Sequence, residues 1–281
     1  MKREIFCDVC AADDWQDKSA LLMFCLSCGL VRAKMDPTES ELAAAYEKEY
    51  FFGGEYVDYI RDRAALEKNF SLRIQDLKKY LAKDSTIIEV GCSFGFFLNL
   101  CSKEFMKCLG YDITKEGIEY ATKTLGQTAF CDSFLNYNGG TVDAVCLWDV
   151  MEHLQYPDKF IQKAAAVVRP GGVIAFSTGD IGSLVARLRG DKWRLVHPPT
   201  HLFYFDKNSA TKLLEKHGFS IVSFTHKKVY RNIDSIFQQL LRGKDSGLVR
   251  WVYALFKKIK LTDKFIGLNL YDIMDVVAVK R

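Results

Sequence analysis

The 281-residue sequence predicts an α/β fold with a parallel sheet, and three observations support this prediction. Short apolar runs typical of buried strands alternate with segments whose apolar residues recur at helical spacing. The turn Gly91-Cys92-Ser93-Phe94-Gly95 joins an apolar run to a helical segment. Polar residues follow several strands, and parallel sheets bind ligands beyond the carboxyl ends of their strands. A hydrophobic content of 49% allows one main core and a small appendage.

The N-terminal segment contains two Cys-x2-Cys pairs, Cys7 with Cys10 and Cys25 with Cys28, separated by 14 residues. Four thiolates at about this spacing are typical of a tetrahedral Zn²⁺ site with no open coordination position. We therefore predict a structural zinc ribbon over residues 1–37. Oxidation of two surface pairs is the alternative, and a reducing cytosol disfavours it.

Helical spacing over residues 39–50 and 56–81 predicts two helices, which form a lid or linker over residues 38–85. Tyr46 and Tyr50 lie one helical turn apart. They either close over a bound cofactor or simply pack against their neighbours.

Residues 86–90 predict a buried strand, and residues 96–101 predict the helix that follows the glycine turn. A second strand over residues 108–111 ends at Asp112, whose carboxylate can accept hydrogen bonds from both hydroxyls of a ribose. This arrangement predicts a nucleotide-like cofactor. The turn also fits the G-x-S-x-G nucleophile elbow of hydrolases, and a dinucleotide fold would require a third glycine where Phe96 stands.

The remaining pattern continues the alternation of helices and strands. Helices are expected over residues 115–125, 157–168 and 207–217, and strands over residues 128–131, 142–148, 173–177, 221–225 and 276–279. The last two strands would complete a seven-stranded sheet as a hairpin. The strand ends to inspect for function are Gly91, Asp112, Asp132-Ser133, Trp148-Asp149 and Thr178-Gly179-Asp180.

These motifs, taken with the run from Trp148 to Leu154 and the turn Arg169-Pro170-Gly171-Gly172, resemble in order those of class I S-adenosylmethionine-dependent methyltransferases. The resemblance implies a Rossmann-like domain over residues 86–281 and S-adenosylmethionine as cofactor. It places the methionine part at the glycine turn, the ribose at Asp112 and the adenine at Asp132 and Ser133. Ser93 departs from the glycine usual there. The expected cofactor-binding residues are Glu89, Gly91, Cys92, Ser93, Gly95, Asp112, Ile113, Asp132, Ser133, Trp148, Tyr46 and Tyr50.

The flanking segments resemble a branch of this family in which a zinc ribbon precedes the methyltransferase domain. That branch includes sugar C-methyltransferases acting on nucleotide-linked keto-sugars and enzymes of polysaccharide pathways. The resemblance rests partly on the run from Pro198 to Phe205, in which His201 matches a proposed base. Pro198 and Thr200 occupy places where the sugar enzymes have tyrosine and glutamate.

His201 is the first candidate for a general base, because a histidine near neutral pH can accept a proton from a weak nucleophile. His153 and Tyr204 are further catalytic candidates. A structural histidine that only organises its loop is the alternative for both His201 and His153.

Residues 220–281 carry 12 Lys and Arg against 5 Asp and Glu, whereas the whole chain has a net charge of +4. About 45 residues separate the last two strands, and we expect a helical insertion over about 230–270 that shapes the acceptor pocket. Three interpretations of residues 246–262 remain open: a helix packed on the core, a phosphate-binding patch, and a helix at a membrane surface.

We expect a cytoplasmic S-adenosylmethionine-dependent methyltransferase whose acceptor is a sugar, glycan or related small metabolite, either phosphorylated or nucleotide-linked. The alternative is a nucleic-acid-binding zinc-ribbon protein or an RNA methyltransferase, although no arginine-rich stripe with interleaved aromatic residues supports it. The sequence does not identify the acceptor, the atom methylated or the oligomeric state.

Overall fold

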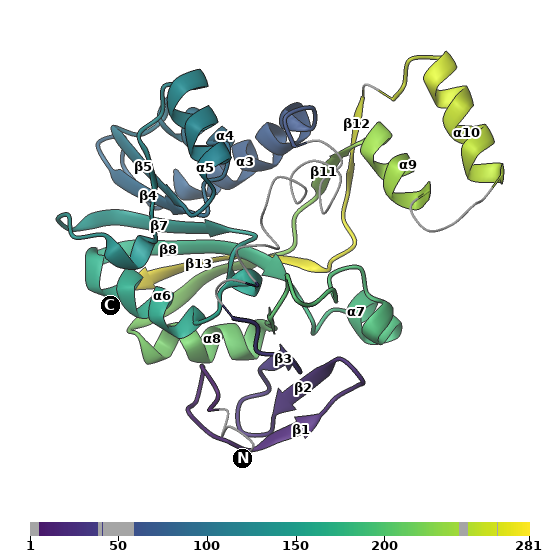
Figure 1. The fold of residues 1–281 in the computed structure, drawn as a ribbon. Coiled ribbons are helices and arrows are strands. Elements are labelled where there is room, and N and C mark those ends of the chain that lie inside the picture. The colour runs from purple at the N-terminus through teal and green to yellow at the C-terminus, as the bar shows by residue number, and fades with distance from the viewer. Residues whose placement is uncertain (1–5, 39–40, 42–58, 242–246, 263) are drawn as a thin grey trace.

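The computed structural model describes residues 6–38, 41, 59–241, 247–262 and 264–281. Its centre is a seven-stranded sheet with the strand order β10-β13-β8-β7-β4-β5-β6 (Figure 1). Only β13 runs antiparallel to its neighbours. The predicted parallel α/β sheet, completed by an antiparallel hairpin, is therefore confirmed. Its strands are β4 (Thr86–Val90), β5 (Lys107–Asp112), β6 (Ala129–Cys131), β7 (Val142–Trp148), β8 (Val168–Gly179), β10 (Phe219–Thr225) and β13 (Ile273–Lys280).

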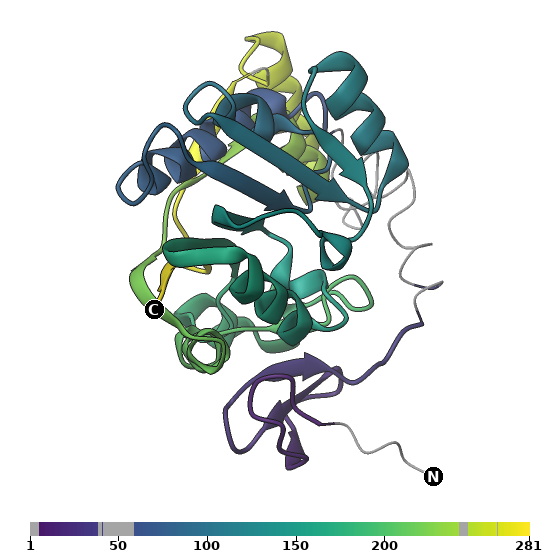
Figure 2. The same cartoon turned by 90° about the vertical axis from the view of Figure 1, so that its left-hand side faces the viewer.

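Helices cover both faces of the sheet (Figures 1 and 2). One face packs against α3 (Arg63–Leu77), α4 (Phe96–Cys101) and α5 (Lys115–Glu119), and the other against α6 (Pro157–Val167) and α8 (Lys207–Lys216). Successive strand residues point to opposite faces, so Ile87 joins one apolar cluster and Ile88 the other. Burial on both faces explains why these strands are almost continuously apolar.

Several elements differ from their predicted bounds by one to three residues, and three differ more in length or in kind. The helix expected over 56–81 is shorter, since α3 begins at Arg63, and the one expected over 115–125 continues from α5 as a π-helix over Tyr120–Thr124. Strand β8 begins at Val168, directly after α6, because Val168 already pairs with Val142 before an irregularity in the ladder. The helix expected over 39–50 lies almost entirely outside the described residues.

The N-terminal segment forms a small sheet that includes a strand from the main domain. Strands β1 (Trp15–Asp17), β2 (Leu22–Cys25) and β3 (Val31–Ala33) are followed in the sheet by β9 (Phe203–Tyr204), which pairs antiparallel with β3. The amide of Ala33 also donates to the carbonyl of Leu202 at 2.9 Å. The N-terminal sheet and the segment around residue 203 are thus one hydrogen-bonded unit.

The long segment between β10 and β13 contains four elements. Strands β11 (Val229–Asn232) and β12 (Phe265–Leu268) pair antiparallel, and between them lie α9 (Ile233–Leu241) and α10 (Gly247–Lys258). Figure 1 shows these two helices at the end of the β11–β12 pair, away from the central sheet. A further helix, α7 (Leu184–Arg189), follows β8. Within the described ranges, every helix is too short or too polar to cross a bilayer.

Candidate active site

The turn after β4 has a backbone that requires glycine. Gly91 and Gly95 have φ values of +72° and +75°, and a Cβ on Gly91 would lie 2.4 Å from Cγ2 of Val150. Gly95 occupies the N-cap position of α4 in the left-handed conformation. Ser93 also has a positive φ, +46°, which residues other than glycine rarely adopt. This conformation explains why the related motif has glycine at that place.

Asp112 ties the glycine turn to the end of β5. Its Oδ2 accepts a hydrogen bond from the Ser93 amide at 2.8 Å, and its Oδ1 accepts from the amide and hydroxyl of Thr114 at 2.8 and 2.6 Å. Burial raises the pKa of Asp112, while these hydrogen bonds oppose the rise. A carboxylate has about four acceptor sites and three are used here, so about one remains for a ribose hydroxyl.

Asp132 and Ser133 follow β6 on the same edge of the sheet. Oδ1 of Asp132 accepts from the Ser133 amide at 2.7 Å and from Asn136 at 2.8 Å. The Ser133 hydroxyl accepts from the amide of Leu135 and caps a short 3-10 turn. Because both residues are held by local bonds, their orientation does not depend on a ligand.

A cavity of about 620 Å³ lies at the carboxyl ends of the strands, and its lining residues include those of the strand ends, α3 and the insertion between β10 and β13. The predicted residues that line it are Gly91, Ser93, Asp112, Ile113, Asp132, Ser133, Trp148, His153 and His201. The lining residues of the insertion are Val229, Tyr230, Arg231, Asn232, Ser235, Ile236 and Gln239. The strand ends and the insertion therefore enclose one continuous space.

Four predicted site residues do not line this cavity. Glu89 is buried in β4 beneath the turn, where burial and the nearby Asp112 raise its pKa well above normal. The Cys92 side chain points at the backbone of Gly110, Gly95 faces Ala121, and the Tyr204 hydroxyl donates to the carbonyl of His201. Tyr46 and Tyr50 lie outside the described residues.

Three histidine rings cluster beside the cavity: His153 and His201, which line it, have ring centroids 4.5 Å apart, and the His197 ring centroid lies 3.8 Å from that of His201. Nδ1 of His201 lies 2.8 Å from the carbonyl oxygen of Leu195, and Nδ1 of His153 lies 2.8 Å from that of Thr200. A carbonyl can only accept, so Nδ1 carries the proton in each ring and Nε2 keeps its lone pair. Burial lowers the pKa of His153 to about 4 and that of His201 well below normal. Both rings are therefore neutral in this tautomer, and each is a weaker base than a free imidazole.

Glu152 lies next to His153 and His201. Its carboxyl is buried, and burial together with Asp149 raises its pKa to about 8. Glu152, His153 and His201 offer ligand atoms that all lie within 4.8 Å of one another, so these three side chains could also hold a cation.

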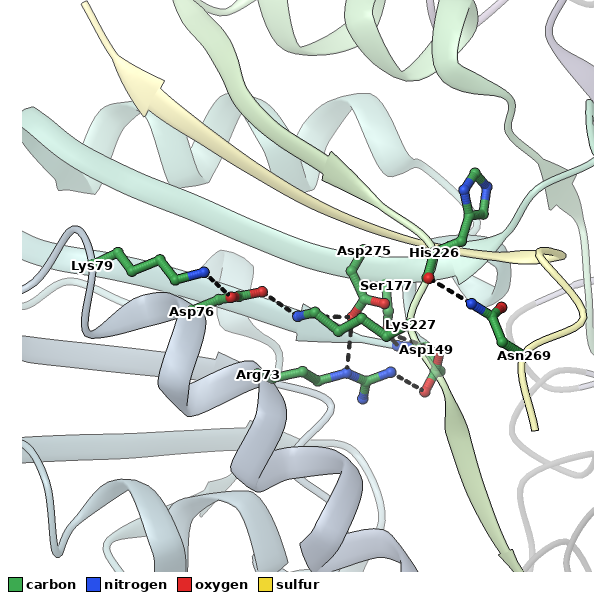
Figure 3. Close-up of polar contacts among 9 residues, drawn as sticks. All are labelled: Arg73, Asp76, Lys79, Asp149, Ser177, His226, Lys227, Asn269 and Asp275. Carbon is green, nitrogen blue, oxygen red and sulfur yellow. Dashed lines mark hydrogen bonds and ion pairs between the residues drawn. The ribbon is translucent and has the colours of Figure 1, made fainter. Parts of the chain in front are cut away.

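A buried arginine that the sequence reading missed joins α3 to two strands (Figure 3). Arg73 bonds Asp149 through Nη2 and Asp275 through Nε, both at 3.2 Å. Its guanidinium lies 4.9 Å from the ring centroid of Trp148. Lys227, at the base of the insertion, contacts Asp76 of α3 and Asp275. Arg73 belongs to a buried stripe of α3 that also contains Phe70, Ile74 and Leu77. A charged residue on such an apolar helix face is the signal by which the sequence could have indicated this contact.

The four N-terminal cysteines converge. The sulfur atoms of Cys7 and Cys28 lie 3.4 Å apart, those of Cys10 and Cys25 lie 3.5 Å apart, and all four lie within 4.8 Å of one another. Four sulfurs at Zn–S distances of about 2.3 Å in a tetrahedron would have such separations. The donor set and its geometry thus fit a structural zinc ion.

A family model described as a methyltransferase domain matches residues 59–224, more than half of the chain, and the chain belongs to this family. The ubiquinone biosynthesis O-methyltransferase of Vibrio parahaemolyticus serotype O3:K6 is 32% identical over 100 residues, covering 33% of this chain and 43% of that protein. The protein of the same name from Colwellia psychrerythraea is 27% identical over 141 residues, covering 43% and 57%. The chain thus spans roughly half the length of these relatives.

Solved structures share the fold. Magnesium protoporphyrin IX methyltransferase from Synechocystis PCC 6803, with bound S-adenosylhomocysteine, has a TM-score of 0.54 at 13% identity and covers 85% of this chain and 100% of that one. A methyltransferase dependent on S-adenosylmethionine from Archaeoglobus fulgidus has a TM-score of 0.55 at 16% identity, covering 83% and 100%. These structures show that the fold is shared, and the family match assigns residues 59–224, with the glycine turn, to a methyltransferase domain and not to the hydrolase or dinucleotide folds considered for that turn.

Proposed function

We propose that this protein is an S-adenosylmethionine-dependent methyltransferase that methylates a hydroxyl oxygen of a small-molecule acceptor, and that His201 is the general base. The observation that carries the proposal is the single cavity that extends from Asp112 to His201. The relatives named as O-methyltransferases support an oxygen acceptor. Their names do not support the sugar or glycan acceptor expected from the sequence, which becomes one acceptor class for the test below.

S-adenosylmethionine, when bound, supplies a methyl group on a sulfonium centre. Asp112 would bind a ribose hydroxyl, Asp132 and Ser133 the adenine, and the glycine turn would allow the methionine part to approach the backbone. The cavity residues would then orient the acceptor oxygen for in-line attack, which is the main contribution a protein makes to this displacement.

His201 would take the acceptor proton on Nε2 as the new bond to oxygen forms. The Leu195 carbonyl holds the ring in the tautomer that this step requires. Trp148 and the insertion residues line the same cavity and would exclude water from the reacting centre. His153, whose ring lies against that of His201, would help to orient it.

We also propose a structural zinc ion at Cys7, Cys10, Cys25 and Cys28. Its thiolates would leave no position for a substrate, so the ion would stabilise the N-terminal sheet and take no part in methyl transfer.

The cofactor site is tested by calorimetric titration with S-adenosylhomocysteine. Asp112→Ala should weaken binding by about ten-fold or more, because charge-assisted hydrogen bonds contribute roughly 1.5–3 kcal/mol each. Asp84→Ala is the matched control, since Asp84 is exposed at the opposite end of β4. Equal affinities of wild type and Asp112→Ala would contradict the assignment.

The acceptor proposal is tested with a panel of phenolic, catecholic and nucleotide-sugar acceptors, by measuring release of S-adenosylhomocysteine. His201→Ala should lower kcat by about 100-fold or more with the best acceptor, while cofactor affinity stays unchanged. His217→Ala, which alters a histidine paired with Asp158 outside the cavity, is the control. Full turnover by His201→Ala would exclude the base role.

A further inference from the structure

Helix α10 exposes an apolar face. The side chains of Leu248, Trp251, Leu255 and Ile259 are 71%, 65%, 42% and 53% exposed. Their spacing of three and four residues places them on one stripe of the helix. Soluble helices normally bury such a stripe against a core, and a stripe that stays exposed indicates an interaction surface.

The opposite side of α10 already has a partner. Tyr253 and Phe256 pack on Phe237 of α9, with ring centroids 5.2 and 5.1 Å apart, and the Tyr253 hydroxyl donates to Asp234. The two helices therefore form a packed hairpin through one side of α10. The Leu248 to Ile259 stripe is left for another surface, and the interpretation of this helix as simply packed on the core is wrong for that stripe.

The charged side chains of α10 itself and of the residues just after it have one sign. Residues 247–262 contain Arg250, Lys257, Lys258 and Lys260 and no Asp or Glu. On a helical wheel, Lys258 falls directly beside Trp251, while Arg250 and Lys257 fall farther round on the same side. Lysine side chains next to an exposed apolar stripe can reach lipid headgroups while their stems lie along acyl chains. Tryptophan is enriched at this depth of a bilayer.

The geometry points to an anionic lipid surface as the partner: we propose that α10 lies in the headgroup region of a bilayer with Leu248, Trp251, Leu255 and Ile259 inserted. Its 12 residues span about 18 Å, which is too short to cross a bilayer of about 30 Å, so the helix lies on the membrane. Neighbouring β12 adds exposed Phe265, Ile266 and Leu268. This inference does not depend on the proposed acceptor or base.

Docking there would have a consequence for the cavity. The insertion that carries α10 also supplies Tyr230, Arg231 and Ile236 to the cavity wall. Figure 1 shows α9 and α10 at the edge of the molecule, joined to the body by β11 and β12. A bilayer bound at α10 would therefore lie beside the segment that encloses the acceptor.

The experiment is co-sedimentation of the full chain with vesicles, without cofactor or acceptor. Wild type should bind vesicles of phosphatidylglycerol mixed with phosphatidylcholine much more tightly than vesicles of phosphatidylcholine alone. Trp251→Ser with Leu255→Ser should weaken binding by about ten-fold or more, through lost insertion. Lys257→Gln with Lys258→Gln should weaken it by roughly five-fold per lysine and reduce its salt dependence. Met106→Ser, which removes an equally exposed apolar side chain near the start of β5, should have no effect.

Two outcomes overturn the inference. One is a wild-type chain that does not sediment with anionic vesicles, or a Met106→Ser variant that loses binding as much as the α10 variants do. The other is a dimer in sedimentation velocity that Trp251→Ser with Leu255→Ser converts to a monomer, since a second copy then covers the stripe. Unchanged S-adenosylhomocysteine binding confirms that each variant is folded, so a failed acceptor or base assignment leaves this test intact.

Discussion

At the scale of single residues, the glycine turn combines a strained backbone with a close approach. Gly91→Ala should weaken S-adenosylhomocysteine binding by about ten-fold or more, because a positive φ costs about 1–3 kcal/mol for other residues and the new Cβ meets Val150. Calorimetry measures the effect. Gly140→Ala is the control, since nothing lies within 4 Å of its Cβ position. Equal affinities for both variants would contradict this account of the turn.

Arg73 provides a second prediction at this scale. Arg73→Met should lower the free energy of unfolding by about 3–5 kcal/mol, because it removes the closer partner of the buried Asp275 carboxylate and leaves only the Lys227 contact at 4.0 Å. Arg73→Met with Asp275→Asn should recover part of the loss. Lys78→Met removes an exposed pair with Glu104 at the end of the same helix and should cost at most about 1 kcal/mol. Urea unfolding compares them, and a small effect of Arg73→Met alone would refute the prediction.

The site residues could be predicted from the sequence where their positions depend on neighbouring residues in the chain. Gly91, Asp112 and Asp132 each end a strand or begin a turn, so their places at the cavity followed from spacing. The Arg73 contacts join residues 76 and 202 positions apart, and no local pattern records them. The departure of Tyr204 from the cavity is likewise tertiary, since its hydroxyl turns back to the His201 carbonyl.

At the scale of elements, the N-terminal sheet depends on the cysteine cluster and also holds β9. We expect Cys7→Ser to reduce bound zinc and to speed amide hydrogen exchange over residues 201–205, because β9 loses the support of β3. S-adenosylhomocysteine binding should remain, since Asp112 and the glycine turn lie on other elements. Cys131→Ser, which changes an exposed cysteine outside the cluster, should keep its zinc. Unaltered zinc content and exchange in Cys7→Ser would argue against the structural metal.

Regular elements were predicted well and short pairings were not. Strand 142–148 has its predicted bounds because a run of buried residues lies between turns. Strand β9 has two residues, and its paired residues in β3 lie 171 and 173 positions away, so its sequence contains no periodicity to detect. The division at residues 37 and 85 remains a prediction.

At the scale of the whole molecule, cofactor binding and enclosure of the acceptor belong to different parts. Replacing residues 233–264 by an Asn-Gly turn would join β11 to β12 directly, since Asn232 pairs with Phe265. We expect the shortened chain to bind S-adenosylhomocysteine within about three-fold of wild type, because nearly all predicted cofactor residues lie on the strand ends. Its KM for the acceptor should rise, since Ser235, Ile236 and Gln239 are gone. A shortened enzyme with wild-type KM would show that the insertion takes no part in acceptor binding.

The pairing of β3 with β9 also restricts how this protein can be recombined with its relatives. In a chimaera that exchanges only residues 1–37, Phe203 and Tyr204 of β9 would stay and would pair with a foreign strand in place of β3. Phe203 lies two positions after His201. The side chains of the foreign strand would then not match those of β9. This mismatch would disturb His201 more directly than the cofactor site. A functional exchange must therefore transplant two separate segments together, the N-terminal one and the loop from residue 197 to residue 205.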